Sequence, residues 1–375
     1  MQTSREFKQR LIFALLFSFG LLLRLLFIPA KTLDMDSYLL WYKYIVENGL
    51  GSIGSDYFGY NPPFIYLLAL ATLTRSFLHP VIAIKLIPFI FDILSAVLVY
   101  RIVRVQEPEG TKPLLAVLIF WIAPTIMINS AFWGQTDSLY TSFLLITVLL
   151  LLKEKPSLAL LAFGIAFAIK AQAILLAPFL GILFFKKYIP FKAFLAFPIV
   201  YAASFIPAIL AGRPIASLFS TYSAQSETFA AASKNAANPY FFIGEQNYQT
   251  AFYAGLVIAA ILLLAWVLIY GFKKYEVTKP NLILTALTSL AIVPYLLPKM
   301  HDRYFYPADV LSIVFAFFFP KFWFVPVAYQ AISFLSYLPY LFNTPANAII
   351  PIAFVFNTLT ILFLLQKQWA MTNET

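Results

Sequence analysis

The chain has no cysteine, only two histidines and few charged residues of either sign. The missing thiols exclude disulfide bonds, thiolate metal sites and a cysteine nucleophile. Two histidines are too few for a histidine-rich metal centre. Charged residues make up 11% of the 375 residues, and hydrophobic residues make up 62%. Because a soluble domain carries about 25% charged residues, a soluble enzyme is excluded.

The formal net charge of +10 could indicate a nucleic-acid partner. The basic residues, however, stand singly or in small groups between long apolar runs. That distribution is typical of the loops of a membrane protein. We therefore expect membrane lipids, and no nucleic acid, as the surroundings of this chain.

The apolar runs predict an all-α polytopic membrane protein with about twelve transmembrane helices in a single domain, residues 1–375. A transmembrane helix needs about 20 apolar residues, and fewer when it is packed inside a bundle. We predict spans at 10–29, 81–104, 113–130, 138–152, 157–170, 171–186, 189–211, 251–272, 281–298, 305–320, 322–341 and 346–366.

One further run, residues 61–77, is predicted to dip into the membrane without crossing it. With that assignment most basic residues, including Lys153, Lys155, Lys186 and Lys187, fall on one side. The positive-inside rule then puts this side and both termini in the cytoplasm. The first extracytoplasmic loop is 31–80, with its partially inserted helix, and a second large one is 212–250.

Half of the 16 acidic residues fall in the extracytoplasmic segments of this topology. Four unusual polar segments lie on the same face, which predicts a functional site there. The alternative is that loops are simply where polar residues go.

The first polar segment directly follows the first span. Asp34 and Asp36 begin a predicted helix that continues to about Asn48. Either acid could act as a general base, given a low-dielectric wall and an acceptor hydroxyl nearby. Alternatively, Asp34 or Ser37 only caps an interfacial helix in which Trp41 belongs to an aromatic belt.

The second segment, residues 132–140, is a short outer turn. Gly134 permits a tight turn, Trp133 offers a stacking face, and Gln135 and Asp137 offer hydrogen bonds. Aromatic rings beside amide and carboxylate groups suit sugar rings. The alternative is that Asp137 only caps the next helix.

The third segment interrupts the apolar run from Ser157 to Phe185. Burying the unpaired ammonium of Lys170 in lipid would cost at least about 2.5–3.5 kcal/mol. A break near Lys170 on the outer face avoids that cost. Lys170 and Gln172 are then expected to face the same cavity as the first two segments.

The fourth segment contains His301 between two cations, Lys299 and Arg303, ahead of a predicted helix. Backbone N–H groups and the helix dipole add to the positive field at a helix N-terminus. A phosphate at the membrane surface suits this cluster. The alternative is a charged interfacial turn.

Two other features carry less specific predictions. Asp92 lies inside a span and needs a partner, for which Lys85, Lys170 and Arg24 are candidates, most simply in a structural ion pair. The loop 212–250 carries a polar stretch, Ser217 to Tyr248, that could be a mobile lid or a passive connector.

Taken in order, these segments resemble the GT-C superfamily of integral-membrane glycosyltransferases. Asp34 with Trp41, followed by Tyr60-Asn61-Pro62-Pro63, is similar to the first loop of ALG-type dolichyl-phosphate-glucose glucosyltransferases, which carry Asp where this chain has Asn61. The dipping run also looks like the first-loop helix of the oligosaccharyltransferase catalytic subunit.

The later segments extend the resemblance. Residues 132–137 are similar to a motif of bacterial mannosyltransferases related to the second GPI mannosyltransferase. Lys170 and Gln172, followed by Pro178, look like the Lys–Gln pair of the superfamily. His301-Asp302-Arg303 is similar to its His-Glu-Lys or His-Glu-Arg motif, with Asp in place of Glu.

The resemblance implies an inverting transfer of a hexose, mannose first, from a polyprenyl-phosphate-sugar donor to a lipid-linked, glycan or protein acceptor. Asp34, with Asp36 in reserve, would be the general base. Lys299, His301, Arg303 and Lys170 would hold the donor phosphate. The residues expected to order sugar or acceptor are Trp133, Gln135, Asp137, Gln172, Trp41, Tyr60 and Asn61. No cofactor is expected, although a divalent metal bridging Asp34 and Asp137 is a less favoured alternative.

Two other functions compete with this interpretation. A transporter or flippase for lipid-linked sugar would place its site near the midplane and often shows internal repeats, and no repeat is obvious here. A glycan ligase or polymerase would be expected to carry a larger outer loop than 212–250. The absence of cysteine and of outer glycosylation sequons favours a prokaryotic plasma membrane.

Overall fold

The computed structural model describes residues 2–217, 220, 230–244 and 247–373, with side chains from residue 11 onward. Within these ranges the chain is helical apart from loops and two very short strands, β1 (Ser233–Lys234) and β2 (Met300–His301). The all-α prediction is confirmed for the described residues.

The longer helices follow the apolar runs. They are α1 (Gln2–Phe27), α2 (Leu33–Asn48), α3 (Pro62–Thr72), α4 (Pro80–Gln106), α5 (Lys112–Ile122), α6 (Pro124–Met127), α7 (Asp137–Leu152), α8 (Pro156–Ile169), α9 (Ala177–Phe185), α10 (Ala196–Leu210), α12 (Tyr248–Phe272), α13 (Lys279–Leu296), α14 (Tyr306–Phe318), α15 (Phe324–Phe342) and α16 (Ala346–Met371). Single helical turns are η1 (Leu50–Gly54), η2 (Ile128–Trp133), η3 (Ala171–Leu176), η4 (Phe191–Leu195), η5 (Pro239–Phe242) and η7 (Pro320–Phe322).

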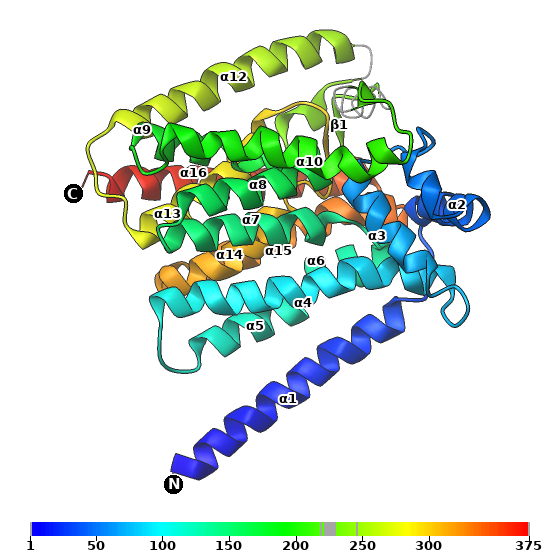
Figure 1. Cartoon of the computed structure of the whole chain (residues 1–375). Coiled ribbons are helices and arrows are strands. Elements are labelled where there is room, and N and C mark those ends of the chain that lie inside the picture. Colours follow the sequence, from blue (N-terminus) through cyan, green and yellow to red (C-terminus); the bar gives the residue numbers. More distant parts are fainter. Residues whose placement is uncertain (1, 218–219, 221–229, 245–246, 374–375) are drawn as a thin grey trace.

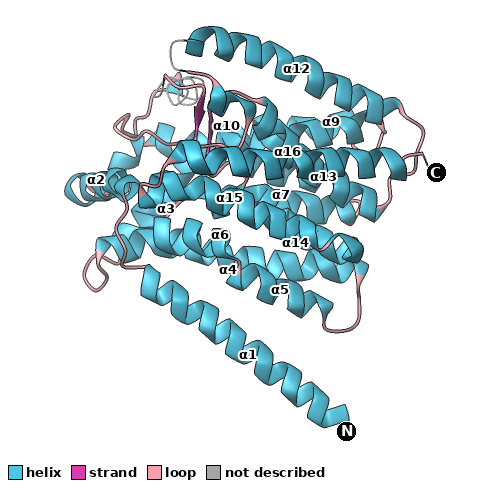
Figure 2. Cartoon of the chain, turned by 180° about the vertical axis from the view of Figure 1, so that it is seen from behind, coloured by secondary structure: helices cyan, strands magenta, loops and turns pink. Residues whose placement is uncertain are grey.

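The helices run roughly side by side in one bundle, and the two termini lie at the same end of it (Figure 1). Helices α2 and α3, together with β1, lie at the opposite end, as the view from behind also shows (Figure 2). The polar segments on α2 and beside β1 therefore lie at the end of the bundle that is remote from both termini.

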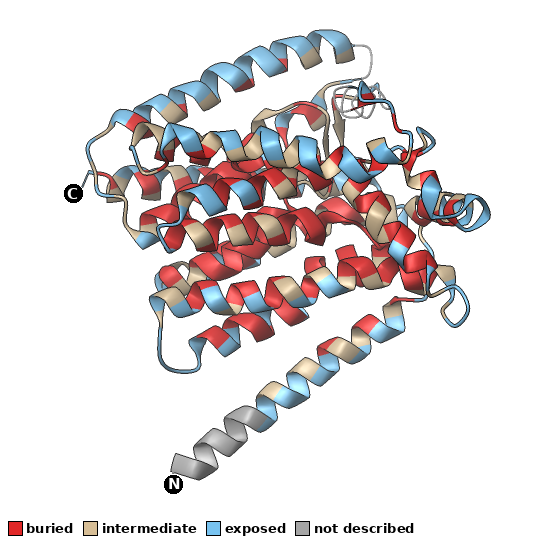
Figure 3. Ribbon diagram, viewed as in Figure 1, coloured by how far each residue is buried: buried red, intermediate tan, exposed pale blue. Residues whose placement is uncertain are grey.

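Buried residues concentrate in the central helices, whereas α1 and α12 are largely exposed (Figure 3). The exposed side chains of α12 are apolar and include Val257, Ile261 and Leu264. Since apolar faces exposed along a whole helix belong in lipid rather than in water, the surface fits a multi-pass membrane protein.

The predicted count of twelve spans is not confirmed. By length and composition five described helices can cross a membrane, α4, α12, α13, α16 and the stretch Phe191–Leu210. A sixth results if α5 and the α6–η2 stretch count as one span bent by 53°. Several other apolar helices have only 10–17 residues, among them Asp137–Leu152, Pro156–Ile169 and Tyr306–Phe318. Helix α3, with 11 residues, is about 16 Å long and too short to cross alone.

Two breaks bring polar groups to the α2 end. Proline at position 124 starts the bent segment, which closes in a π-helical turn, η2, and in Gly134 with φ +79°. A Cβ on Gly134 would lie 2.6 Å from Cε of Met35, so a larger residue would have to displace the end of the Met35 side chain and adopt a positive φ. The second break follows Ile169, where Lys170 is extended (φ −153°, ψ 131°).

Strands β1 and β2 pair in parallel, with Ser233 opposite Met300 and Lys234 opposite His301. The amide of Lys299 donates to Ala232 O at 2.7 Å, and the amide of Asp302 donates to Lys234 O at 2.8 Å. This two-residue ladder fixes the turn that carries His301 against the second outer loop.

Candidate functional site

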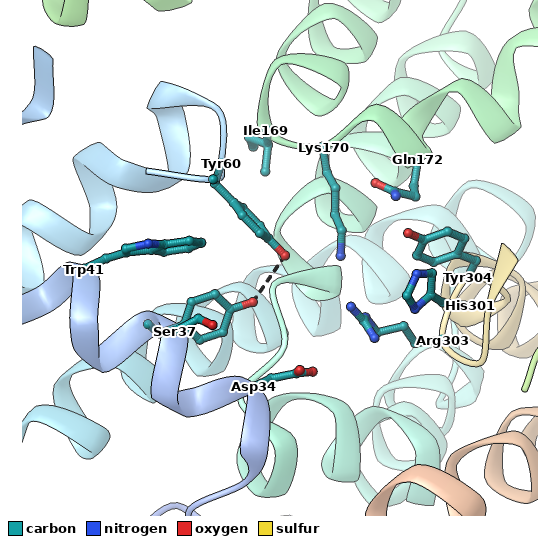
Figure 4. A pocket seen from close by; sticks show the side chains of 12 residues that line it. Asp34, Ser37, Trp41, Tyr60, Ile169, Lys170, Gln172, His301, Arg303 and Tyr304 are labelled. Atoms are coloured by element: carbon teal, nitrogen blue, oxygen red, sulfur yellow. Dashed lines mark hydrogen bonds between the residues drawn. The ribbon is translucent and has the colours of Figure 1, made fainter. Parts of the chain in front are cut away.

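A cavity of about 320 Å³ opens at the α2 end of the bundle, and its walls include residues of the first, third and fourth predicted segments. It is lined by Asp34, Ser37, Tyr38, Trp41, Gly59, Tyr60, Ile169, Lys170, Gln172, His301, Arg303 and Tyr304. Figure 4 shows Asp34 and Tyr60 on one side of this space and Lys170, His301 and Arg303 on the other. Residues that are more than 250 positions apart in the sequence thus share one cavity.

Asp34 is held in place by three hydrogen-bond donors. Its Oδ2 accepts from Trp133 Nε1 at 2.9 Å and from the side-chain amide of Gln135. Its Oδ1 accepts from the phenol of Tyr340 at 2.7 Å. A carboxylate offers about four lone-pair positions, so these contacts fix the orientation of Asp34 and leave room for one further donor.

Asp36 lies elsewhere, although it is only two residues away. Its Oδ1 is 2.6 Å from Lys31 Nζ, and its side chain is 54% exposed. It does not line the cavity that contains Asp34. Successive residues of a helix point about 100° apart, so the side chains of Asp34 and Asp36, which are two residues apart, point in nearly opposite directions. Only one of these two acids can therefore face this cavity.

Asp137 anchors the cations of the site from behind. Its side chain is fully buried; Oδ1 is 2.5 Å from Lys170 Nζ, and Oδ2 accepts from Asn129 Nδ2 at 3.0 Å. Arg303 Nε lies 3.7 Å from the same Oδ2. As the first residue of α7, Asp137 is also favoured by the helix dipole. Its contacts fix Lys170 and Arg303 at the cavity wall.

His301 is neutral in this environment. Burial, assisted by Arg303, Lys234 and Lys170, lowers the pKa of His301 to about 2. A neutral imidazole has one N–H donor and one acceptor nitrogen. The next residue, Asp302, is also buried, and burial raises its pKa to about 7 against the opposing effect of Arg303.

Aromatic side chains form the wall opposite the cations. The rings of Trp41 and Tyr60 are 5.3 Å apart, and the Tyr38 and Tyr60 hydroxyls are 3.3 Å apart. Gln172 and Tyr304 lie beside His301 (Figure 4). Aromatic faces next to hydrogen-bonding side chains are a surface on which a sugar ring can pack.

Several predicted site residues lie behind the cavity wall instead of lining it. Trp133 and Gln135 are fully buried and contact Asp34. Asn61 is buried and donates to Ala168 O at 3.0 Å, where α8 ends. The Nζ of Lys299 lies 5.0 Å from the ring of Tyr248 on α12, and Lys299 is absent from the lining.

Tyr340 and Asn129 are site residues that sequence reasoning missed. Tyr340 stacks on Trp133, with ring centroids 5.1 Å apart, in addition to its bond to Asp34. Nothing in the local sequence near the end of α15 distinguishes it from an ordinary interfacial tyrosine. Asn129 could have been suspected, because this polar residue lies three positions before the segment 132–140 that contains Asp137.

Asp92 forms the expected ion pair, and its partner is Arg24. Arg24 Nε is 3.6 Å from Asp92 Oδ2, to which Ser130 Oγ also donates at 2.5 Å. The ammonium of Lys85 instead donates to the backbone oxygens of Ala30, Ala131 and Phe132. Both groups lie outside the cavity lining.

The second outer loop is described in part. Residues 218–219, 221–229 and 245–246 lie outside the described residues, so the alternative of a lid or a connector for Ser217–Tyr248 stays a prediction. In the described part, Asn238 Nδ2 donates to the oxygens of Pro294 and Leu297, each at 3.2 Å. Because Pro298 has no N–H to bond Pro294 O, Asn238 supplies the missing donor.

The described side chains contain no group of three or more acidic or histidine residues that could hold a metal ion. Both oxygens of Asp137 already contact Lys170 or Asn129. The residues therefore fit a metal bridging Asp34 and Asp137 poorly.

The fold and the cavity define a multi-pass membrane protein with one carboxylate, Asp34, and two cations, Lys170 and Arg303, in a cavity at one end of its bundle. The sequence profile of glycosyltransferase family 87 matches residues 58–298, which is more than half of the chain. The chain therefore belongs to glycosyltransferase family 87. A search of curated proteins finds no match.

The family membership supports a membrane glycosyltransferase. It does not show the narrower similarity to ALG-type glucosyltransferases or to bacterial mannosyltransferases. Asp34, His301 and Arg303 also lie outside the matched residues. Their place at the site is given by the geometry alone.

Proposed function

We propose that the protein is an inverting hexosyltransferase that uses a polyprenyl-phosphate sugar, with mannose as the first choice of hexose. The acceptor is a lipid-linked, glycan or protein hydroxyl. The observation that carries this proposal is the shared cavity, in which one fixed carboxylate faces three phosphate-binding side chains. Its volume of about 320 Å³ is at the small end of ligand pockets, which suits a single sugar with its phosphate.

Asp34 is proposed as the general base. The acceptor oxygen forms a bond to the anomeric carbon while the bond from that carbon to the phosphate oxygen breaks. The acceptor proton passes to the Asp34 carboxylate, and the electron pair of the broken bond leaves with the phosphate. The three donors to Asp34 hold it in one orientation, which a positioned base requires.

Lys170, His301 and Arg303 are proposed to hold the departing phosphate. Negative charge grows on the phosphate as the bond breaks, and fixed cations in a site with little water stabilise it. Charge-assisted bonds of Lys and Arg to phosphate are among the stronger hydrogen bonds in proteins. Neutral His301 adds one N–H donor. Asp137 acts here as a positioning residue for both cations, so the proposed chemistry requires no metal.

The other predicted residues take supporting roles. Trp41, Tyr60 and Gln172 line the cavity and are proposed to contact the sugar. Trp133 and Gln135 act through Asp34, and Asn61 fixes the end of α8 beside Lys170. Lys299 is proposed to contribute to the positive field rather than to contact the phosphate.

We propose that the cavity faces the extracytoplasmic side of a prokaryotic plasma membrane. The termini lie at the other end of the bundle (Figure 1). The basic turns at Lys153–Lys155 and Lys186–Lys187, which follow α7 and α9, lie at that end too. The positive-inside rule assigns an end of this kind to the cytoplasm.

The family membership favours a transferase over a transporter or flippase. The site is also at one end of the bundle, whereas transporters bind substrate near the membrane midplane. A ligase or polymerase that moves a finished glycan would need space for several sugars, which a cavity of this size favours less.

The proposal is tested with purified protein and a labelled polyprenyl-phosphate hexose. We expect Asp34→Asn to lower the transfer rate by about 10²–10⁴-fold while the thermal midpoint in detergent stays near that of the native protein. Asp56→Asn is the matched control. Asp56 is an exposed acid at the same end of the bundle, and it does not line the cavity that contains Asp34, Lys170 and Arg303.

Three results would contradict the proposal. Native rates in Asp34→Asn would remove Asp34 as the base, and a far larger loss in Asp36→Asn than in Asp34→Asn would assign the base to Asp36. Movement of the labelled lipid across proteoliposomes without a new glycosidic bond would favour transport.

A further inference from the structure

The second outer loop brings a further cation, Lys234, beside the cavity. Lys234 lies on β1, which pairs in parallel with β2, and it is opposite His301 in the register of this pair. Neighbouring strands are about 4.8 Å apart, and residues directly opposite each other present their side chains to the same face. Since His301 lines the cavity, Lys234 stands next to a residue of the cavity wall.

The segment that carries Lys234 is held by hydrogen bonds to its main chain. Lys234 O accepts from the amide of Asp302 at 2.8 Å. Three residues further on, Ala237 is fully buried, and its oxygen accepts from Asn357 Nδ2 of α16 at 2.8 Å. A charge on a fixed segment needs little reorganisation when opposite charge develops on a ligand. Because these bonds use the main chain of the segment, they remain when the Lys234 side chain is changed.

The ammonium of Lys234 interacts electrostatically with groups on both sides of the cavity. Burial lowers the pKa of Lys234, and this effect is opposed by Asp302, assisted by Arg303 and opposed by Asp34. The same ammonium helps to lower the pKa of His301. Asp34 lies on one side of the cavity, and His301 and Arg303 lie on the other (Figure 4). A phosphate between them is therefore within electrostatic range of Lys234.

The charges of the cavity balance before any phosphate enters. Lys170 and Arg303 line the cavity with two positive charges. The carboxylates of Asp34, in the lining, and Asp137, paired with Lys170, supply two negative charges. A donor phosphodiester adds one negative charge. The phosphate monoester that remains after transfer carries about −1.5 to −2 at pH 7, so the site needs further positive charge most when the sugar has left.

We infer that Lys234 is a further phosphate-stabilising cation of this site, whose charge offsets that of the monoester left by sugar transfer. This inference rests on the proposed function. Lys234 acts through its charge, while the residues that line the cavity supply the direct hydrogen bonds. The strand β1 of the second outer loop is then part of the site.

Farnesyl phosphate, a phosphate monoester on a short isoprenoid chain, serves as the probe, and its methyl ester serves as the matching diester. The Kd of each is measured by calorimetry in detergent at pH 7. We expect Lys234→Met to raise the Kd of the monoester at least about tenfold and that of the diester at most about fourfold, because the Coulomb energy scales with the charge of the ligand. Lys234→Arg keeps the charge and should change neither Kd more than about twofold.

Lys43→Met is the matched control. Lys43 is an exposed cation on α2 at the same end of the bundle, and it does not line the cavity. It should change neither Kd. Lys234→Gln repeats the removal of charge with a polar side chain, and we expect the same ratio of the two Kd values as in Lys234→Met.

Three results would overturn the inference. The first is an unchanged monoester Kd in Lys234→Met. The second is an equal rise for monoester and diester, which is what a merely structural role of Lys234 would give. The third is a native protein that does not bind farnesyl phosphate.

Transfer from a labelled polyprenyl-phosphate hexose separates this inference from the proposed function. We expect kcat/KM for the donor to fall at least about tenfold in Lys234→Met, since the charge develops as the sugar leaves. Binding of farnesyl phosphate that depends on Lys234, without any transfer by the native protein, would overturn the proposed function and keep the role of Lys234. Native binding and native transfer in Lys234→Met would overturn the role of Lys234 and keep the proposed function.

Discussion

Two of the carboxylates that the bundle buries against cations, Asp92 and Asp137, differ in what their cations face. Asp92 on α4 pairs with Arg24, and Asp137 on α7 pairs with Lys170 and, at 3.7 Å, with Arg303. Both carboxylates are fully buried. Lys170 and Arg303 line the cavity that contains Asp34, whereas Arg24 does not.

The difference teaches that a buried ion pair is not by itself a functional signal. The Asp92 pair links α1 to the bundle, and Arg24 additionally bonds Trp121 O at 2.5 Å. The Asp137 pair presents its cations to a space that a ligand can enter. Stability should therefore depend mainly on the first pair, and activity on the second.

The largest expected effect is on stability, in Arg24→Met. Removing one partner of a buried pair leaves an uncompensated charge and costs about 3–5 kcal/mol. We expect a clearly lower thermal midpoint in detergent, with the transfer rate per folded molecule unchanged. A native midpoint in Arg24→Met would contradict the structural assignment of this pair.

The next effect is on activity, in Lys170→Met. Loss of one fixed charge at the departing phosphate should lower kcat/KM by about 10²–10³-fold. Asp137 keeps Asn129 and Arg303 as neighbours, so the midpoint should fall less than in Arg24→Met. If Lys170→Met loses stability but keeps its kcat/KM, the two pairs are alike and the comparison fails.

A smaller effect is expected from Gly134→Ala. Alanine is disfavoured at φ +79°, and strain of this kind costs about 1–3 kcal/mol; its Cβ would also meet Met35, the neighbour of Asp34. We expect a lower midpoint together with a lower transfer rate. Gly110→Ala is the control, because Gly110 also has a positive φ, +97°, but a Cβ there meets nothing within 4 Å. If Gly110→Ala loses as much transfer rate as Gly134→Ala, the contact with Met35 is not the cause of the loss.

The smallest effect is on pH dependence. The pKa of His301 is lowered to about 2, so the unfolded state binds the proton more readily and His301 destabilises the fold as pH falls below about 6.5. The pKa of Asp302 is raised to about 7, so the fold loses stability as pH rises from about 4 to 7. Between pH 4.5 and 6.5 the two effects oppose each other.

Single substitutions should separate these opposed slopes. Between pH 4.5 and 6.5 the midpoint of His301→Gln should fall as pH rises, because Asp302 acts alone. The midpoint of Asp302→Asn should rise over the same range. Each group can contribute up to about 1.4 kcal/mol per pH unit. If the midpoints of both variants change with pH in the same direction, the assignment of a deprotonated His301 beside a protonated Asp302 is wrong.

Much of the arrangement could be predicted from the sequence, because the polar segments interrupt apolar runs. The break at Lys170 was expected from the cost of burying an ammonium, and the extended backbone there shows it. The class of membrane glycosyltransferase was also expected, and the family supports it. The number of spans was not predictable from run length, because a break such as the one at Pro124 divides a run that reads as a whole span, 113–130.

The directions of side chains could not be read from the sequence. Asp137 reads equally well as a sugar ligand or as a cap, and its direction toward Lys170 depends on how α7 and α8 pack. The partner of Asp92 could be narrowed to three cations but not to Arg24. Tyr340 contacts Asp34 across 306 positions, and no local pattern encodes a contact of that range.

That last contact has a consequence for biosynthesis. The residue proposed to accept the proton is translated 306 positions before Tyr340 on α15, one of the groups that orient it. Ribosome-bound intermediates that lack α15 would expose an incompletely oriented carboxylate. Glycosyl transfer should therefore begin only after α15 has been translated.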